Sequence, residues 1–404
     1  MASPVDTSVK HFLSTMTGAP ALSGTVGSMI ALLDAMLVTG FDTKTLTSLT
    51  VVGGVATAAF SGQHSAIVDS VILVAGVAGG PAGWAGHNGE QKVTAVGAGL
   101  VRFATTLPDG TYTGTITIKM APAGWVKAFT GTNVAVYQST DPQSSKMLLR
   151  VDDSNAQFVR VRGFETMQDA NIGTGLFPLD SQQGGGGYWP KSSAASNNPV
   201  GWAFAADSRF FYISTLPGTA NAANRQIGNI RAFGDPVVTR PSGDAYACLL
   251  NYSTSGTSYT QFDNCLSSTS AGISACARAY SGLGSCVLHK LNVWGGGASA
   301  AQTSGITGIH GAFPNPIDGG LYLARRFIGT ADNNFPRAEI PGSYQMLQSA
   351  GYDNFRSGDR VPGTGALTGK TLVAVHGSGG NNFDYTSSSG NTSVLFIDVT
   401  GPWR

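Results

Sequence analysis

The residue types that most often perform acid–base chemistry are scattered singly along this chain. Six histidines stand apart from one another, in loops or at the ends of predicted strands: His11, His64, His87, His289, His310 and His376. The patterns His-Glu-x-x-His, Gly-x-Ser-x-Gly and Gly-x-x-x-x-Gly-Lys-Ser/Thr, which would place a metal, a nucleophile or a phosphate, do not occur. A lone histidine is typically a structural hydrogen-bonding residue. We therefore predict no catalytic residue, and a protein that is not an enzyme.

Carboxylates come closest to a catalytic pair at Asp152 and Asp153, at the end of a predicted strand, Lys146–Val151. Adjacent strand residues point to opposite faces, so these two side chains cannot act as acid and base on one bond. A turn or a weak cation site is the better interpretation.

Two oxygen-rich stretches also invite a calcium interpretation: Asp332-Asn333-Asn334, and Gly379-Gly380-Asn381-Asn382 followed by Asp384. A calcium ion needs about six to eight converging oxygen ligands, and turns explain the same composition. We predict no metal and no cofactor.

Four cysteines fall in one part of the chain, namely Cys248, Cys265, Cys276 and Cys286. None of their spacings is Cys-x-x-Cys, so a zinc site is a weak hypothesis. We predict buried free thiols.

Tyr188 and Trp189 follow a run of four glycines and are the candidate binding residues. They could form an aromatic platform for sugar rings on the protein surface, or pack across a sheet, which is the more common role. Small basic clusters occur at Arg325-Arg326 and at Arg150, Arg160 and Arg162. Arg160 and Arg162 would share a strand face and could pair with acids of a neighbouring subunit.

Composition narrows the function classes. Only 12% of the residues are charged, the net charge is +1, and 55 residues are glycine. The cationic excess that drives nucleic-acid binding is therefore missing, and no nucleic-acid partner is expected. The longest apolar stretches, 29–38 and 66–78, are too short and too interrupted to span a bilayer, so no membrane insertion is expected. The first residues do not read as a secretory signal.

One helix is predicted after Thr25, with apolar residues at helical spacing, Thr25 or Ser28 as its cap and Gly40 at its end. Its apolar face should pack on a sheet. The rest of the chain is β-rich, with Ser, Thr, Asn and Gly in the connections. Predicted strands are 48–60, 70–75, 91–96, 100–104, 114–120, 133–138, 146–151, 157–164, 200–206, 209–214, 245–251, 285–294, 371–376 and 394–399.

The fold class that follows is mainly β, with several small β-barrel or β-sandwich modules, one short N-terminal helix and an extended N-terminal arm. We expect the arm at 1–24, of a kind that often lies on a neighbouring subunit. A helix plus small β-barrel should occupy 25–122 and a central β-sandwich with long loops 123–300. A C-terminal β segment, 301–404, should pack on the central domain.

The chain resembles structural proteins of tailed bacteriophages and prophages in three places. The stretches that carry the resemblance are Gly24-Thr25-x-Gly27-Ser28-x-Ile30-x-Leu32-Leu33-Asp34-Ala35-x-Leu37-Val38-x-Gly40-Phe41, the segments from Ala56 to Val96, and the string from Gly163 to Pro178. Similar small β modules occur in phage tail and other virion proteins. Where that module usually has a glycine pair after its histidine, this chain has Ser65-Ala66-Ile67-Val68-Asp69. The resemblance implies a subunit in many symmetric copies, made in the host bacterial cytoplasm and incorporated into the virion.

The leading hypothesis is thus a non-enzymatic structural subunit of a tailed phage, in the tail or its tip or baseplate. Its partners would be other copies of itself and other phage structural proteins. One alternative is a receptor- or glycan-binding tail protein whose loops at 181–199 and 253–285 touch the host surface. A second is a capsid decoration protein. A third, a β-fold polysaccharide-degrading enzyme, would need an acidic cluster that the sequence does not show.

Overall fold

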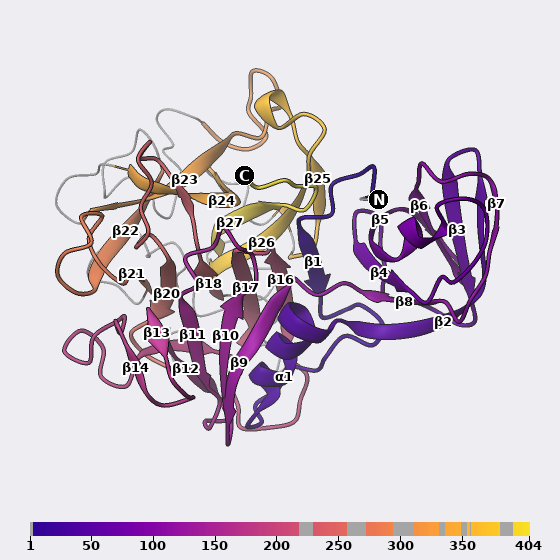
Figure 1. Ribbon diagram of the computed structural model, residues 1–404. Helices are drawn as coiled ribbons and strands as arrows, with labels where there is room; N and C mark the ends of the chain where they lie inside the picture. Colours follow the sequence, from indigo (N-terminus) through magenta and orange to yellow (C-terminus); the bar gives the residue numbers. More distant parts are fainter. Residues whose placement is uncertain are drawn as a thin grey trace.

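Two antiparallel sheets account for most of the chain in the computed structural model, which is mostly β (47% strand, 6% helical). The structure describes residues 3–217, 229–256, 272–293, 311–330, 336–348, 354–355, 357–379 and 391–404. One sheet closes into a small barrel and the other forms a larger, half-barrel body. In Figure 1 the barrel stands to the right of the body, and β2 and β8 (Phe41–Val52 and Thr117–Met120) run between them. The predicted mainly β fold class is confirmed.

The barrel is a ring of six strands, ordered β2-β3-β6-β5-β4-β8 and closed by pairing of β8 with β2. A seventh strand, β7 (Gly110–Tyr112), adds to the free side of β2. The remaining ring strands are β3 (Val55–Phe60), β4 (Val71–Ala75), β5 (Gly89–Gly97) and β6 (Leu100–Ala104). Alternate residues point inward, and those that fill the barrel are apolar.

The stretch predicted as one strand, 48–60, is instead a hairpin of β2 and β3. Gly53 and Gly54 form its turn with φ of 59° and 76°, a left-handed conformation that a residue with a Cβ rarely adopts. The sequence pattern missed the turn because apolar residues continue on both sides of it.

The predicted helix begins at Ser28 and ends near Gly40, as α1 (Ser28–Leu33) followed directly by a π-helical turn, η1 (Asp34–Thr39). Its apolar side is fully buried against the sheets, as predicted. Neither predicted cap is used in the expected way, because Gly27 takes the N-cap position without a side-chain bond. The Met36 carbonyl accepts a hydrogen bond from the Ala123 N–H, which diverts it from the regular helical pattern. Two short 3-10 helices are η2 (Trp84–His87) and η6 (Gly365–Leu367).

The body sheet begins with the N-terminal arm. In the arm, β1 (Lys10–Leu13) pairs with β16 (Gly201–Ala206), and Leu22 forms an isolated bridge with Val200. These arm residues therefore pair with the chain's own sheet, which satisfies backbone groups on one side of β1.

From the middle of the chain the body takes β9 (Trp125–Gly131), β10 (Val134–Ser139), β11 (Leu148–Asp152), β12 (Phe158–Phe164), β15 (Gly187–Pro190), β17 (Phe210–Leu216), β18 (Asn229–Gly234), β19 (Val237–Val238), β20 (Leu249–Ser253), β21 (Gly272–Cys276) and β22 (Val287–Val293). A separate two-stranded ribbon joins β13 (Thr166–Met167) and β14 (Gly173–Thr174).

The last part of the chain continues the same sheet. Its strands are β23 (Leu323–Thr330), β24 (Pro336–Met346), β25 (Arg360–Pro362), β26 (Thr371–Gly379) and β27 (Asn391–Asp398). Pairing of β22 with β23 and of β19 with β24 makes the central and C-terminal segments one sheet.

Polar contacts fix the barrel to the body. Lys92, a barrel residue only 2% exposed, donates to the carbonyls of Val399 and Thr400 at 3.0 and 3.2 Å. Lys10 of the arm pairs with Glu90 at 2.8 Å. These buried, charge-assisted contacts hold the two parts in one arrangement.

Candidate interface and the predicted site residues

One side of the outer surface of the barrel, over β7, β2, β3 and β6, is almost free of charge at its outward strand positions. We call it the threonine face and define it by the outward positions of β7, β2, β3 and β6: Ser48, Thr50, Val52, Val55, Thr57, Ala59, Leu100, Arg102, Ala104 and Thr111. Their sequence neighbours, such as Leu49, Val51 and Ala56, are buried inside the barrel. Because strand side chains alternate between faces, the residues of the threonine face point outward and their sequence neighbours point into the barrel.

Strand register arranges these residues in rows. Thr111, Thr50, Thr57 and Arg102 form one row across four strands. A second row joins Val52, Val55 and Ala104, and a third joins Ser48, Ala59 and Leu100. Cross-strand neighbours stand about 4.5–5.5 Å apart, so the rows make a continuous surface.

Arg102 is the one charged residue of the threonine face, and its Nε donates to Thr57 Oγ1 at 3.4 Å. About a quarter of the residues of an ordinary domain are charged, most of them on its surface. Exposed strands commonly carry lysine or other charges that discourage contact with other chains. A face of mostly short side chains with one charged residue has little of that protection and suits close packing against another protein.

The predicted aromatic platform does not exist as a pair. Trp189 is 1% exposed, packs edge-on against Phe211, and donates from Nε1 to the Asn251 carbonyl at 2.7 Å. Tyr188 points to the other face of β15 and is half-buried beneath Arg160, whose guanidinium carbon lies 3.8 Å from the ring centroid. Neighbouring residues of a strand face opposite ways, so Trp189 belongs to the core and is no part of a surface platform.

Asp152 and Asp153 point to opposite faces, as predicted. Asp153 is fully buried and forms an ion pair with Lys191, which is also fully buried. Its second carboxylate oxygen accepts from the Met29 and Ile30 N–H groups at 2.8 and 3.2 Å. Burial raises the pKa of Asp153 and lowers that of Lys191, so each group depends on its partners to remain charged. The pair anchors the first turn of α1, a role that sequence spacing gave no sign of.

A buried polar network joins His289, Arg337 and Asp244. Arg337 binds the Asp244 carboxylate with two contacts, 2.7 and 3.2 Å, and its Nη1 lies 2.7 Å from His289 Nε2. His289 Nδ1 lies 3.1 Å from the Gly329 carbonyl, which requires Nδ1 to carry the proton and Nε2 to accept from Arg337. Burial, and secondarily the Arg337 charge, lowers the pKa of His289 to about 4. Both ring nitrogens are occupied, so this histidine cannot move a substrate proton.

The other described histidines differ in their burial. His64 is half-buried: its Nδ1 accepts a hydrogen bond from the Ala66 N–H at 3.0 Å, its Nε2 lies 3.9 Å from the Asp42 carboxylate, and burial lowers its pKa. His11 and His87 are buried, and burial lowers the pKa of His11 to about 3 and of His87 to about 4. His87 lies inside the barrel with its ring centroid 4.3 Å from that of Tyr112. His310, and the side chain of His376, lie outside the described residues.

Cys248, Cys276 and Cys286 are free and buried, as predicted, whereas Cys265 lies outside the described residues. Burial raises the pKa of Cys276 and of Cys286 to about 12, so both remain thiols at neutral pH.

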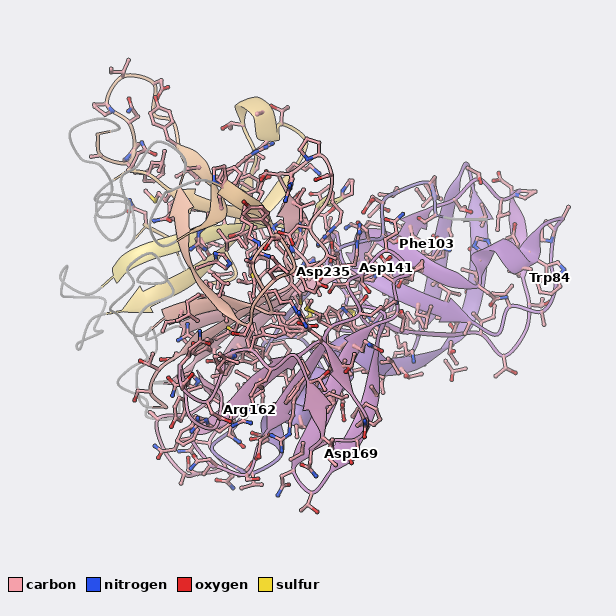
Figure 2. The ribbon with its side chains drawn as sticks, turned by 60° about the vertical axis from the view of Figure 1, so that its left-hand side comes forward. Trp84, Phe103, Asp141, Arg162, Asp169 and Asp235 are labelled. Atoms are coloured by element: carbon pink, nitrogen blue, oxygen red, sulfur yellow. The ribbon has the colours of Figure 1, made fainter. Side chains whose placement is uncertain are left out.

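Arg160 and Arg162 do share a face, but their partners belong to the same chain. Arg162 pairs with Asp180 at 2.6 Å, and Arg160 donates to the Tyr188 hydroxyl at 2.6 Å and to carbonyls of the glycine run. Figure 2 shows Arg162 on the body, away from the barrel that contains Phe103 and Trp84. In the other basic cluster, Arg326 is buried and Arg325 is exposed beside Glu339.

The oxygen-rich stretch at 332–334 lies outside the described residues, as does that at 380–384. Among the residues that are described, no three His, Cys, Asp or Glu side chains come together to hold a metal ion.

Sequence reasoning missed one exposed aromatic residue. Tyr280 is 58% exposed, in the loop between β21 and β22, and the guanidinium carbon of Arg240 lies 4.7 Å from its ring centroid. The only signal in the sequence was its position in a long polar connection.

No family model matches the chain, and a search of curated proteins found no relative. In the part of the chain that is described, no helix is long and apolar enough to cross a membrane.

Proposed function

We propose that this chain is a non-enzymatic structural subunit of a tailed phage virion, placed in the tail or its tip and assembled in symmetric copies. Its partners would be further copies of the chain and other virion proteins. The proposal joins the sequence resemblance to one structural observation, the threonine face of the barrel, whose outward positions include a single charged residue.

The threonine face supports an assembly role because it stands apart from the body, where another subunit can reach it (Figure 1). Its outward side chains are short and lose little rotamer freedom when a neighbour covers them, so ordering them costs little. It also lacks charges that would have to be desolvated in the contact, apart from Arg102.

A non-enzymatic role is supported by the state of the reactive side chains. Among the described residues, His11, His87 and His289 are buried and His64 is half-buried, all four have lowered pKa values, and the cysteines are buried thiols. General acid–base catalysis needs such a group within hydrogen-bond reach of a substrate.

The experiment places carboxylates on the threonine face. A double variant, Thr50→Glu with Thr111→Glu, puts two like charges on directly paired strand positions. We expect it to fold and to be absent from particles viewed by electron microscopy with an antibody against the chain. Wild-type chain should be present, at repeated symmetric positions on the tail.

The matched control is Thr130→Glu, an exposed strand threonine near the end of β9 in the body. It should incorporate as the wild type does. Particles that never carry the wild-type chain would refute the virion role, and a folded double variant that incorporates normally would refute the role of the threonine face.

A further inference from the structure

Tyr280 is the one aromatic residue among the strongly exposed large apolar side chains of the described residues. Its neighbour in the same loop, Leu283, is 75% exposed. A tyrosine ring buries more area on folding than most side chains, so leaving one in solvent forgoes stability. These two side chains are therefore free to contact a ligand.

Arg278 fixes the loop that carries Tyr280 through several side-chain contacts. The guanidinium of Arg278 makes two contacts with the Glu165 carboxylate, 2.5 and 3.0 Å, and donates to the Gly282 carbonyl at 3.2 Å. It also lies over the ring of Tyr246, 5.3 Å from the centroid. Gly282 has a φ of 75° and its Cα lies against that same ring, where a Cβ would meet Tyr246 at 2.8 Å. The exposed side chains thus project from a fixed base.

Arg240 supplies a charge at the same place. Its residue is exposed, and its guanidinium stacks on Tyr280. Within the described residues no carboxylate lies within ion-pair distance of Arg240. The contact with the ring uses none of the hydrogen-bond donors of Arg240, so its N–H groups can bind an anion, which arginine holds with two parallel hydrogen bonds.

We propose that Tyr280 and Arg240 form a binding site for a saccharide that bears a carboxylate, such as a uronic acid unit of a polysaccharide. The apolar face of the sugar ring would pack on Tyr280 and Leu283. Its carboxylate would accept hydrogen bonds from Arg240. This proposal does not depend on the virion role.

The size of the patch favours a sugar over a protein partner. A stable protein interface buries about 800 Å² on each partner, with a central cluster of apolar anchors. Tyr280 and Leu283 are the only strongly exposed large apolar side chains of the described part of this loop, and turn residues such as Gly282 and Gly284 surround them. One sugar unit needs no more than such a patch.

The test titrates the full chain with short oligomers of galacturonic, glucuronic and mannuronic acid, each compared with its neutral hexose oligomer, by calorimetry. We expect at least one acidic oligomer to bind and its neutral counterpart to bind about tenfold more weakly or not at all. Arg240→Gln and Tyr280→Ala should each weaken binding about tenfold. Tyr280→Phe, which keeps the ring, should retain it.

Arg325→Gln is the matched control, since it removes an exposed arginine of β23 in the body that lies over no described aromatic ring. Binding should not change in this variant. The proposal is overturned if none of the three acidic oligomers binds at about 10 mM, or if Arg325→Gln weakens binding as much as Arg240→Gln. It is also overturned if Tyr280→Ala leaves saccharide binding unchanged and instead removes the chain from particles, because the patch would then be a protein contact. Failure of saccharide binding alone leaves the virion proposal intact.

Discussion

Lowering the pH from 7 to 5 should reduce the stability of this protein by about 2 kcal/mol through His289 alone. In the folded state this histidine is buried, and its Nε2 accepts a hydrogen bond from Arg337, which is already paired with Asp244. Protonation would place a second cation against the guanidinium. The folded protein therefore resists taking up the proton, whereas the unfolded chain accepts it freely.

The magnitude follows from the two pKa values. His289 has a pKa of about 4 in the folded state, against 6.5 in the reference state. Because the folded pKa is the lower one, the unfolded state binds more protons between these values, and stability falls as the pH falls from about 6.5 to about 4. Each full pKa unit corresponds to about 1.4 kcal/mol, so the loss is about 2 kcal/mol at pH 5 and levels off near 3 kcal/mol below pH 4.

The assay compares wild type with His289→Gln by urea denaturation over a series of pH values. Glutamine keeps an oxygen that can accept from Arg337 but does not titrate in this range. We expect the variant to be less stable at pH 7 and to lose about 2 kcal/mol less than the wild type between pH 7 and pH 5. His11 and His87 are present in both proteins, so the difference isolates His289.

Two parallel stability curves for wild type and variant would refute this reasoning, since His289 would then titrate alike in both states. A His289 ring signal that titrates near 6.5 in the folded protein by NMR would refute it independently.

Two further predictions concern paired neighbours in strands. Asp153→Asn should destabilise the protein by about 3–5 kcal/mol in urea denaturation because it leaves the buried Lys191 ammonium without its counter-charge. Asp152 is half-exposed, so Asp152→Asn should change stability by no more than about 0.5 kcal/mol. If the two variants lose the same stability, the claim that only Asp153 is buried is wrong. Trp189→Ala should cost about 3–5 kcal/mol through the cavity it leaves, and Tyr188→Ala about 1 kcal/mol. A Trp189→Ala protein as stable as the wild type would show that the ring is not part of the core.

Local patterns predicted much of the secondary structure. The strand expected at 100–104 is β6, and those at 157–164 and 209–214 differ from β12 and β17 only at their ends. The helix was visible because its apolar residues recur at helical spacing. The alternation of side chains along a strand also predicted that Asp152 and Asp153 point to opposite faces. These features depend on residues that are close together in the sequence, so the sequence alone predicts them.

Functional roles were harder to predict because alternation says which residues face together but not which face is inside. Tyr188 and Trp189 were seen as one aromatic pair, yet only packing against Phe211 decided that Trp189 is buried. No sequence pattern around Tyr280 indicated that its side chain would be exposed. Its exposure depends on how Arg278, far from Glu165 in sequence, holds the loop.

The sequence by itself determined that this is an uncharged, β-rich chain with one short helix near its start, because composition and periodicity act over a few residues. A small barrel was expected near the start, but only the tertiary structure decided which six strands close it and that the arm joins the body sheet. It also brought Asp153 to Lys191 and Arg240 to Tyr280. The physical reason is that register and closure depend on hydrogen bonds and packing between segments far apart in the chain, and no local pattern encodes which partner each segment will find.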